Sequence, residues 1–334
     1  MARITVLGCG FGTALSVMFD KYGHEVSAWT KYRDEIEAIQ RDGEHKKLLP
    51  GVIVPPSISF DTDKSIISNA EIVVFAIPSK FVREVARNVK EYVPENAVIL
   101  NVGKGFEEGT NKRLSQVLEE EFPNNPVVVM AGPCHAEEVG RDMPTTVVMA
   151  SREDRYAEYL QETLQNQHFR IYVNDDVAGC ELGAALKNPI ALCCGIVEGM
   201  GLGDNTLAAL MTRGLTEITR LGVQLGAKWE TFTGLAGVGD LIVTCTSTHS
   251  RNHRAGLLIG GGTTADEAVR KVGTVEGYGC VKIAYEIAKE LGVAVPIIEQ
   301  LYKVCYEGVD PPDCVKQLMS RPSKHEKERY WNLP

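Results

Sequence analysis

The stretch that decides the fold is residues 3–29, RITVLGCGFGTALSVMFDKYGHEVSAW. Its first five residues form a short apolar run, which predicts a strand, and a glycine-rich turn follows at residues 8–12. Residues 13–22 have the pattern of a helix, and residues 25–29 predict a second strand. In this order the glycines let the backbone approach a pyrophosphate, and the helix N-terminus offers it free N–H groups. The stretch therefore predicts the opening of a Rossmann-type dinucleotide-binding domain.

The glycine turn departs from the usual spacing. The pattern typical of such turns is G-x-G-x-x-G, whereas Gly8, Gly10 and Gly12 give G-x-G-x-G, so the loop is one residue short. This shortening puts the affinity for a pyrophosphate in question.

The charges after the second strand bear on the choice of cofactor. An acidic residue at this place favours NAD, and a basic residue accommodates the extra phosphate of NADP. The first charged residues here are Lys31 and Arg33, and the acidic Asp34 and Glu35 come later. We therefore expect NADP(H) to be favoured and NAD to be tolerated, unless Lys31 and Arg33 are only solvated surface charges.

Apolar runs continue to alternate with helical segments up to residue 173. The further predicted strands are residues 71–77, 97–102, 127–131, 145–150 and 169–173. Near-continuous apolar strands separated by helices indicate a parallel sheet that is buried on both faces. The predicted fold class of residues 1–174 is therefore α/β, with a Rossmann-like, doubly wound parallel sheet.

Ligands of such sheets bind beyond the carboxyl ends of the strands. The glycine turn, Pro78, Lys104 and the segment 132–136 all lie at predicted strand ends. Lys104 stands between two glycines, so its amine is a candidate to contact a negatively charged ligand, although a surface lysine would have the same surroundings in sequence.

The second half of the chain shows no convincing strand pattern. Its predicted helices are residues 175–200, 205–226, 266–271, 278–291, 296–306 and 311–319. We expect an all-α domain over residues 175–334, with the boundary near residue 174.

The first of these helices, DDVAGCELGAALKNPIALCCGIVEGM (175–200), carries an interior lysine, Lys187. Lysine is almost never fully buried unless it is paired, and Glu181 is one candidate partner. Gly183 lies one turn before Lys187 on the same face and would leave room for a small ligand. The helix is therefore either a core helix with a lysine–glutamate pair or the site of a functional amine.

Residues 234–262 are rich in glycine, serine and threonine and predict a long loop between helices. Within it, Ser250, Arg251 and Asn252 combine a planar guanidinium donor with uncharged donors, which suits a phosphate group. His249 and His253 have the spacing of zinc ligands, but no third ligand is evident and Arg251 would repel a cation, so we expect no metal. Ser250 has no partner pattern of a hydrolase triad.

Composition narrows the function class. The formal net charge of -9 argues against a nucleic-acid surface. Nine cysteines without a CxxC pair predict free buried thiols in a reducing compartment rather than a disulfide framework. We find no signal peptide pattern and no long apolar run free of charge or glycine, so we expect a cytoplasmic protein without a membrane span.

Long motifs in a fixed order now point to a family. They are GCGFGTAL (8–15), VGKGFE (102–107), GPCHAEEV (132–139), ELGAALKNPIA (181–191), GLGDNTLAALMTRGLTE (201–217), GVGDLIVTCTSTHSRNHRAG (237–256), VEGYG (275–279) and QLMSR (317–321). With these motifs the chain resembles bacterial glycerol-3-phosphate dehydrogenase (NAD(P)+) along almost its whole length.

The resemblance implies a role for each matching residue. Lys187 would be catalytic and donate a proton to the carbonyl oxygen of dihydroxyacetone phosphate. The implied substrate contacts are Lys104, Gly132, Cys134, Asn188, Asp240, Ser250, Arg251 and Asn252. The implied cofactor contacts are Gly8, Gly10, Phe11, Gly12, Lys31, Lys104, Ala136, Arg251 and Glu276. Position 134 is usually Ser in the family, and a thiol is a weaker hydrogen-bond donor than a hydroxyl.

The resemblance further implies a supply of sn-glycerol 3-phosphate for phospholipid synthesis, and a homodimer is one candidate assembly. Two alternatives stay open at this point. One is a related two-domain dehydrogenase that acts on a hydroxy acid or a sugar acid. The other is a non-catalytic nucleotide-sensing protein, which the shortened glycine turn would favour.

Overall fold

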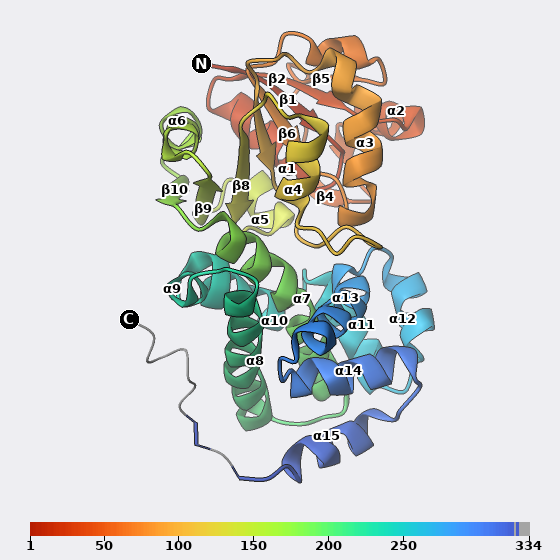
Figure 1. The fold of residues 1–334 in the computed structure, drawn as a ribbon. Helices are drawn as coiled ribbons and strands as arrows, with labels where there is room; N and C mark the ends of the chain where they lie inside the picture. Colours follow the sequence, from red (N-terminus) through yellow and green to blue (C-terminus); the bar gives the residue numbers. More distant parts are fainter. Residues whose placement is uncertain (324, 327–334) are drawn as a thin grey trace. The chain divides into compact units, whose positions relative to one another are not determined.

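The computed structural model describes residues 1–323, 325 and 326 (Figure 1). The chain divides into two compact units. The first unit contains residues 1–107 and 112–177, and the second contains residues 108–111 and the chain from Ala178 onward.

The first unit is built on an eight-stranded sheet with the order β10-β9-β8-β7-β6-β1-β2-β5. The strands are β1 (Arg3–Leu7), β2 (Glu25–Trp29), β5 (Ser59–Asp61), β6 (Ile72–Phe75), β7 (Val98–Asn101), β8 (Val127–Ala131), β9 (Thr145–Ser151) and β10 (Phe169–Asn174). The predicted parallel pairing is confirmed from β8 across to β2, and β5, which was not predicted, pairs parallel to β2. The pair β9 and β10 is a departure, because β9 runs antiparallel to β8 while β10 runs parallel to β9.

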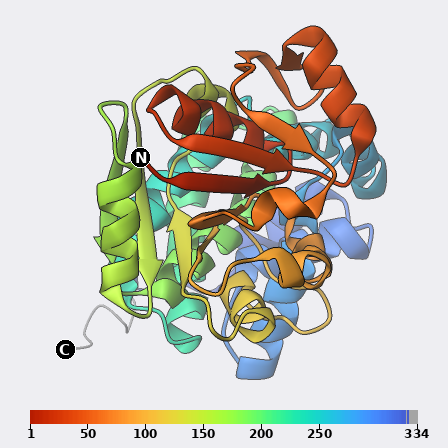
Figure 2. The same cartoon turned by 90° about the horizontal axis from the view of Figure 1, so that it is seen from above.

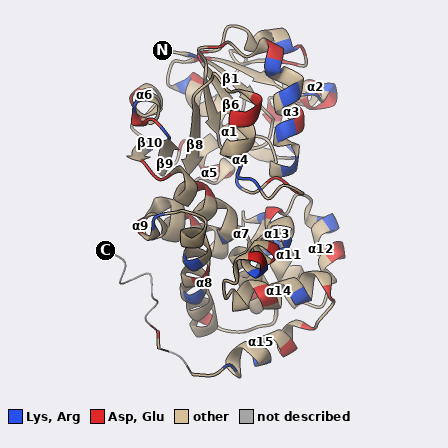
Figure 3. Cartoon of the chain, viewed as in Figure 1, with Lys and Arg blue, Asp and Glu red and all other residues tan. Residues whose placement is uncertain are grey.

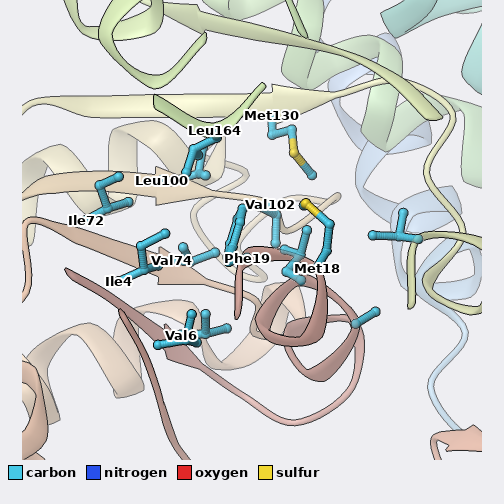
Figure 4. Close-up of a cluster of buried hydrophobic side chains, with 14 of the residues drawn as sticks. Ile4, Val6, Met18, Phe19, Ile72, Val74, Leu100, Val102, Met130 and Leu164 are labelled. Carbon is cyan, nitrogen blue, oxygen red and sulfur yellow. The ribbon is translucent and has the colours of Figure 1, made fainter. Parts of the chain in front are cut away.

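Helices cover both faces of this sheet, as predicted for a doubly wound fold (Figure 2). Residues of α1 (Phe11–Lys21) and α6 (Asp154–Leu164) belong to the apolar cluster on one face, and residues of α3 (Val82–Val89) and α4 (Leu114–Glu121) belong to the cluster on the other. Figure 4 shows the first cluster, in which Met18 and Phe19 of α1 pack near strand residues such as Val74. In β6 successive residues alternate between the two clusters, which explains why its sequence is continuously apolar.

Besides β5, four smaller α-helices and strands of the first unit were not predicted from the sequence. They are α2 (Arg33–Asp42), the antiparallel pair β3 (Glu44–His45) and β4 (Leu49–Ile53), and α5 (Ala136–Gly140). The helix α5 packs against α1, with Gly140 close to Ala14 and Val52.

The second unit is helical, and its described residues contain no strand, as predicted. Its helices are α7 (Val177–Gly199), α8 (Asp204–Gln224), α9 (Trp229–Phe232), α10 (Asp240–Thr246), α11 (Arg251–Gly260), α12 (Ala265–Val272), α13 (Glu276–Leu291), α14 (Pro296–Tyr306) and α15 (Pro311–Met319). The predicted loop over residues 234–262 is wrong, because α10 and α11 occupy most of it and a π-helical turn, η4 (Leu235–Gly239), leads into α10.

Helix α7 is the central element of this unit. In the part of the chain that the structure describes, it is the one helix with the length and apolar composition to cross a membrane, yet 94% of its apolar window is buried inside the structure. This burial is typical of the core helix of a globular domain. Pro189 lies inside the helix, two residues after Lys187.

Candidate functional site

The glycine turn after β1 keeps three distinct glycine roles despite its short spacing. Gly8 has φ +101°, and a Cβ added there would lie 2.6 Å from the carbonyl oxygen of Ala76. A Cβ at Gly12 would lie 2.9 Å from Cγ1 of Val6, so this glycine lets α1 pack closely on the sheet. By contrast, a Cβ at Gly10 would meet no heavy atom within 4 Å.

This pattern matches what a dinucleotide-binding turn requires: one glycine for the turn, one for close approach of the pyrophosphate, and one for helix–strand packing. The open side of the turn is at Gly10, which is the N-cap of α1. The first turn of α1 carries no acidic residue, and Phe11 is its first residue. A pyrophosphate therefore fits the residues present, and the missing loop residue removes none of the three roles.

The ends of β7 and β8 bring three predicted ligand residues together. Lys104 Nζ donates to the backbone oxygen of Gly132 at 3.0 Å and lies 3.4 Å from Sγ of Cys134. Gly132 has φ +109°, a conformation that L side chains rarely adopt. The Cys134 thiol donates to Gly132 O at 3.2 Å. The predicted gathering of strand-end residues is therefore seen within this unit.

Two other predicted cofactor contacts lie in the same unit. Lys31 follows β2, is exposed, and forms an ion pair of 3.1 Å with Glu84 of α3. The hydrogen bond that Lys31 donates to Glu84 raises the pKa of Lys31. Ala136 is the first residue of α5 and packs against the same apolar cluster as Phe11.

In the second unit, Lys187 has partners that the sequence did not predict. Its side chain is only 4% exposed, and Nζ donates to the carboxylate of Asp240 and to Oγ1 of Thr244, the latter at 2.8 Å. Thr244 Oγ1 in turn donates to the backbone oxygen of Asp240 at 2.6 Å. Both of these partners come from α10, where Asp240 and Thr244 lie four residues apart and share one face of the helix.

Gly183 does not leave room for a ligand, contrary to expectation. A Cβ added at Gly183 would lie 2.4 Å from the backbone oxygen of Ala236 and 3.6 Å from Cα of Gly237. The backbone of η4 fills the space one turn before Lys187. The missing side chain therefore serves close packing, which brings α10 near enough to α7 for Asp240 to reach Lys187.

A buried relay of amides joins three helices next to this pair. Asn252 Nδ2 donates to Oδ1 of Asn188 at 3.0 Å, and Asn252 Oδ1 accepts from the backbone N–H of Gly277 at 2.8 Å. The relay ties the first turn of α11 to α7 and to the first turn of α13. It therefore fixes the backbone of the neighbouring predicted ligands, Arg251 and Glu276, which are the first residues of α11 and α13.

The three residues predicted to bind a phosphate, Ser250, Arg251 and Asn252, consequently have different surroundings. Arg251 is exposed, while Ser250 and Asn252 are buried. Ser250 is the N-cap of α11, and its hydroxyl oxygen accepts from the backbone N–H of His253 at 3.2 Å. Ser250 and Asn252 thus hold the start of α11, where Arg251 is the exposed first residue.

Close crossing of α7 and α11 depends on glycines spaced four apart. Gly195 and Gly199 on α7 face Gly256 and Gly260 on α11. A Cβ at Gly256 would lie 2.2 Å from Leu192 O, and a Cβ at Gly195 would lie 2.1 Å from His253 O. Backbone therefore touches backbone along this crossing, which sets the position of the α11 N-terminus relative to α7.

The two histidines considered as metal ligands have separate surroundings. His249 is exposed before α11, whereas His253 is buried and its Nε2 lies 3.0 Å from Oε2 of Glu198. Among the residues that the structure describes, no group of three or more His, Cys, Asp or Glu side chains could hold a metal ion.

Comparison with known proteins decides the family. Residues 3–157 match the family model for the N-terminus of NAD-dependent glycerol-3-phosphate dehydrogenase, and residues 176–316 match the model for its C-terminus. The chain belongs to the NAD-dependent glycerol-3-phosphate dehydrogenase family.

Individual relatives agree over the whole length. The chain is 49% identical to glycerol-3-phosphate dehydrogenase [NAD(P)+] of Desulfitobacterium hafniense, over 98% of this chain and 94% of that protein. It is 48% identical to the Clostridium tetani protein of the same name, over 97% and 93%. The crystal structure of glycerol-3-phosphate dehydrogenase from Coxiella burnetii superposes with a TM-score of 0.91 at 35% identity, covering 96% of this chain and 99% of that chain.

Within each unit of this glycerol-3-phosphate dehydrogenase family member, the predicted site residues form compact groups. Lys104, Gly132 and Cys134 form one group, and Lys187 with Asp240 forms another. Thr244 was left out of the predicted site, although its position four residues after Asp240 was the available signal. Asp240 was predicted to contact the substrate, and the structure pairs its carboxylate with Lys187.

Proposed function

We propose that this protein is an oxidoreductase that transfers a hydride between NAD(P)H and dihydroxyacetone phosphate to give sn-glycerol 3-phosphate. Membership of the family supports the reaction. The observation that carries the assignment in this chain is the buried Lys187 ammonium, held between Asp240 and Thr244 in an apolar helix.

The reduction of a carbonyl group requires a proton donor that is held in place near the carbonyl oxygen. The bound nicotinamide supplies the hydride, and negative charge grows on the substrate oxygen as the hydride arrives. An ammonium held in place stabilises this charge and supplies the proton. Asp240 favours the charged form of Lys187, while burial opposes it. Asp240 and Thr244 accept hydrogen bonds from the ammonium and hold it in a fixed position.

The remaining residues bind the two ligands. We assign residues 1–174 to the dinucleotide and residues 175–334 to substrate and catalysis. The turn at Gly8, Gly10 and Gly12 accepts the pyrophosphate, and Lys104 contacts both substrate and cofactor. Arg251 offers its planar fork to the phosphate of the substrate, since guanidinium geometry suits phosphate oxygens.

The deciding experiment follows the oxidation of NADPH and of NADH, separately, with dihydroxyacetone phosphate. Lys187→Ala should abolish turnover and leave NADPH affinity nearly unchanged. Because this change leaves the Asp240 carboxylate buried without its cation, the double variant Lys187→Met/Asp240→Asn serves as a second, neutral test. A folded double variant with substantial turnover would remove Lys187 from the chemistry.

Arg251 can be tested against a neighbour on its own helix. Arg251→Ala should chiefly raise the KM for dihydroxyacetone phosphate, because a phosphate contact is lost. Arg254 is also exposed on α11 and provides the matched control, Arg254→Ala, for which we expect the parent KM. Equal KM values for the two variants would take Arg251 out of the phosphate site.

Finer properties are part of the same proposal. The basic Lys31 supports a preference for NADPH, and the ratio of kcat/KM for NADPH and NADH measures it. We also propose a cytoplasmic enzyme, a homodimer, and a role in supplying phospholipid synthesis. Turnover of hydroxy acids or sugar acids in place of dihydroxyacetone phosphate would favour the other dehydrogenase class. Failure to bind NADPH, followed by its fluorescence, would remove the dinucleotide site.

A further inference from the structure

The loop that carries Lys104 is anchored on both sides of a short glycine-flanked segment. On the β7 side, the backbone N–H of Gly103 donates to Oδ1 of Asn101 at 3.1 Å. On the other side of the loop, Phe106 is 5% exposed and forms an antiparallel β-bridge with Arg113. The backbone N–H of Glu107 donates to the backbone oxygen of Lys112 at 2.9 Å.

The side chain of Glu107 is held by a guanidinium from another element. Arg83, in the first turn of α3, donates from Nε to Oε1 of Glu107 at 2.5 Å and from Nη2 to Oε2 at 2.8 Å. This is a two-bond fork, which fixes orientation as well as distance. Both side chains are largely buried, with exposed fractions of 19% for Arg83 and 14% for Glu107.

The same guanidinium also contacts the end of α4. Nη1 donates to Glu121 at 2.8 Å and Nη2 to Glu120 at 2.8 Å. Figure 3 marks the basic and acidic residues along α3 in blue and red. Hydrogen bonding to Glu107 is nevertheless the largest cause that raises the pKa of Arg83. Arg83 therefore ties α3 and α4 to the Lys104 loop, and the fork to Glu107 is the part of the cluster that reaches the loop.

The position of the Lys104 side chain depends on this anchoring because the backbone of its own segment can adopt many conformations. Gly103 and Gly105 flank it in sequence, and glycine leaves the backbone many conformations. Its ammonium is nonetheless placed at 3.0 Å from Gly132 O. Only two residues lie between Lys104 and Glu107, so we expect a shift of Glu107 to displace the Lys104 amine.

We propose that Arg83 and Glu107 are positioning residues, which act through the loop to hold the Lys104 ammonium at the ligand site. This inference rests on the proposed contact of Lys104 with substrate and cofactor. Neither side chain needs to touch a ligand itself.

The test uses Glu107→Gln and Arg83→Lys in the full chain. Glutamine keeps the shape of Glu107 and loses its charge, while lysine keeps the charge of Arg83 and cannot form the fork. Two variants serve as matched controls. Glu120→Gln removes an α4 carboxylate that contacts the same Arg83 guanidinium, and Arg87→Lys changes the other α3 arginine that contacts Glu121. The readouts are kcat, KM for dihydroxyacetone phosphate, NADPH affinity and thermal unfolding.

Both test variants should lower kcat/KM by about tenfold to a hundredfold, the range expected when a reacting group is displaced by up to an ångström. The two controls should stay within about threefold of the parent, the size of a surface ion pair's contribution. In a Lys104→Ala background, Glu107→Gln should add less than about threefold, because the group it positions is gone.

Three outcomes would overturn the proposal in distinguishable ways. A full effect of Glu107→Gln in the Lys104→Ala background would show a general structural role. Parent activity in both test variants, with low activity in Lys104→Ala, would overturn the positioning role and leave the role of Lys104 intact. Parent activity in Lys104→Ala itself would overturn the proposed ligand contact of Lys104 and this inference together.

Discussion

Replacing Gly183 by alanine tests the packing that brings Lys187 to Asp240. Gly183 lies one turn before Lys187 in α7, and a Cβ there would lie 2.4 Å from the backbone oxygen of Ala236. The obstructing atoms are backbone, so no side-chain rotation relieves the contact. The π-helical turn that contains Ala236 leads directly into α10, which carries Asp240.

The size of the effect follows from the geometry. Ordinary contacts of a Cβ begin near 3.4 Å, so Ala236 must move by about 1 Å. Overpacking of this kind costs about 1–3 kcal/mol, against a gain of about 1 kcal/mol in helix propensity for Gly→Ala. The larger consequence is functional, because a displacement of about 1 Å near the reacting groups can lower the rate by about a hundredfold.

The assay measures kcat with NADPH and dihydroxyacetone phosphate, NADPH affinity, and the free energy of unfolding in urea. Gly279→Ala is the matched control, since Gly279 is an exposed glycine inside α13 whose added Cβ would meet no heavy atom within 4 Å. We expect Gly279→Ala to keep kcat and to be as stable as the parent or more so. A Gly183→Ala protein with parent kcat and increased stability would refute the packing role.

Three further predictions concern single sites. The Gly10→Ala variant should fold normally and bind NADPH about tenfold or more weakly. This loss corresponds to one hydrogen bond to a charged group, and fluorescence titration measures it. Cys134→Ser should lower the KM for dihydroxyacetone phosphate by about two- to tenfold in steady-state assays, because a hydroxyl is the better donor. Burial raises the pKa of Glu217 from 4.5 to about 7, although its carboxylate accepts the N–H groups of Ile297 and Ile298. The folded state therefore binds this proton more tightly than the unfolded state does. The stability that the protonated Glu217 carboxyl contributes is fully present below pH 4.5 and is lost as the pH rises to about 7. The difference in unfolding free energy between the parent and Glu217→Gln should change by about 3 kcal/mol across this range, measured in urea at several pH values.

The sheet was largely predictable because each of its central strands is buried on both faces. In β6 the residues Ile72–Phe75 alternate between two apolar clusters, so the run reads as uninterrupted hydrophobic sequence. The direction of β9 was not predictable in the same way. Its central residues are as buried as those of β8, and a buried apolar run does not encode whether it lies parallel or antiparallel to its neighbour.

The lysine site was predictable in part. An interior charge in an apolar helix singled out Lys187 as either a paired core lysine or a functional amine, but the sequence did not reveal its partner on α10. Asp240 is 53 residues further along the chain, whereas the one candidate partner that the sequence offered, Glu181, is near in sequence. Long-range pairs of this kind depend on how α10 packs on α7, which no local pattern specifies.

The prediction of a loop over residues 234–262 failed because its glycines were read as turn residues. Gly256 and Gly260 lie inside α11, where each faces backbone atoms of α7 at distances that no Cβ could occupy. Gly195 and Gly199 repeat the same spacing of four on the partner helix. Glycines four apart on two apolar segments therefore indicate a close helix crossing, and here that crossing holds Asn252 against Asn188 and sets where Arg251 begins α11.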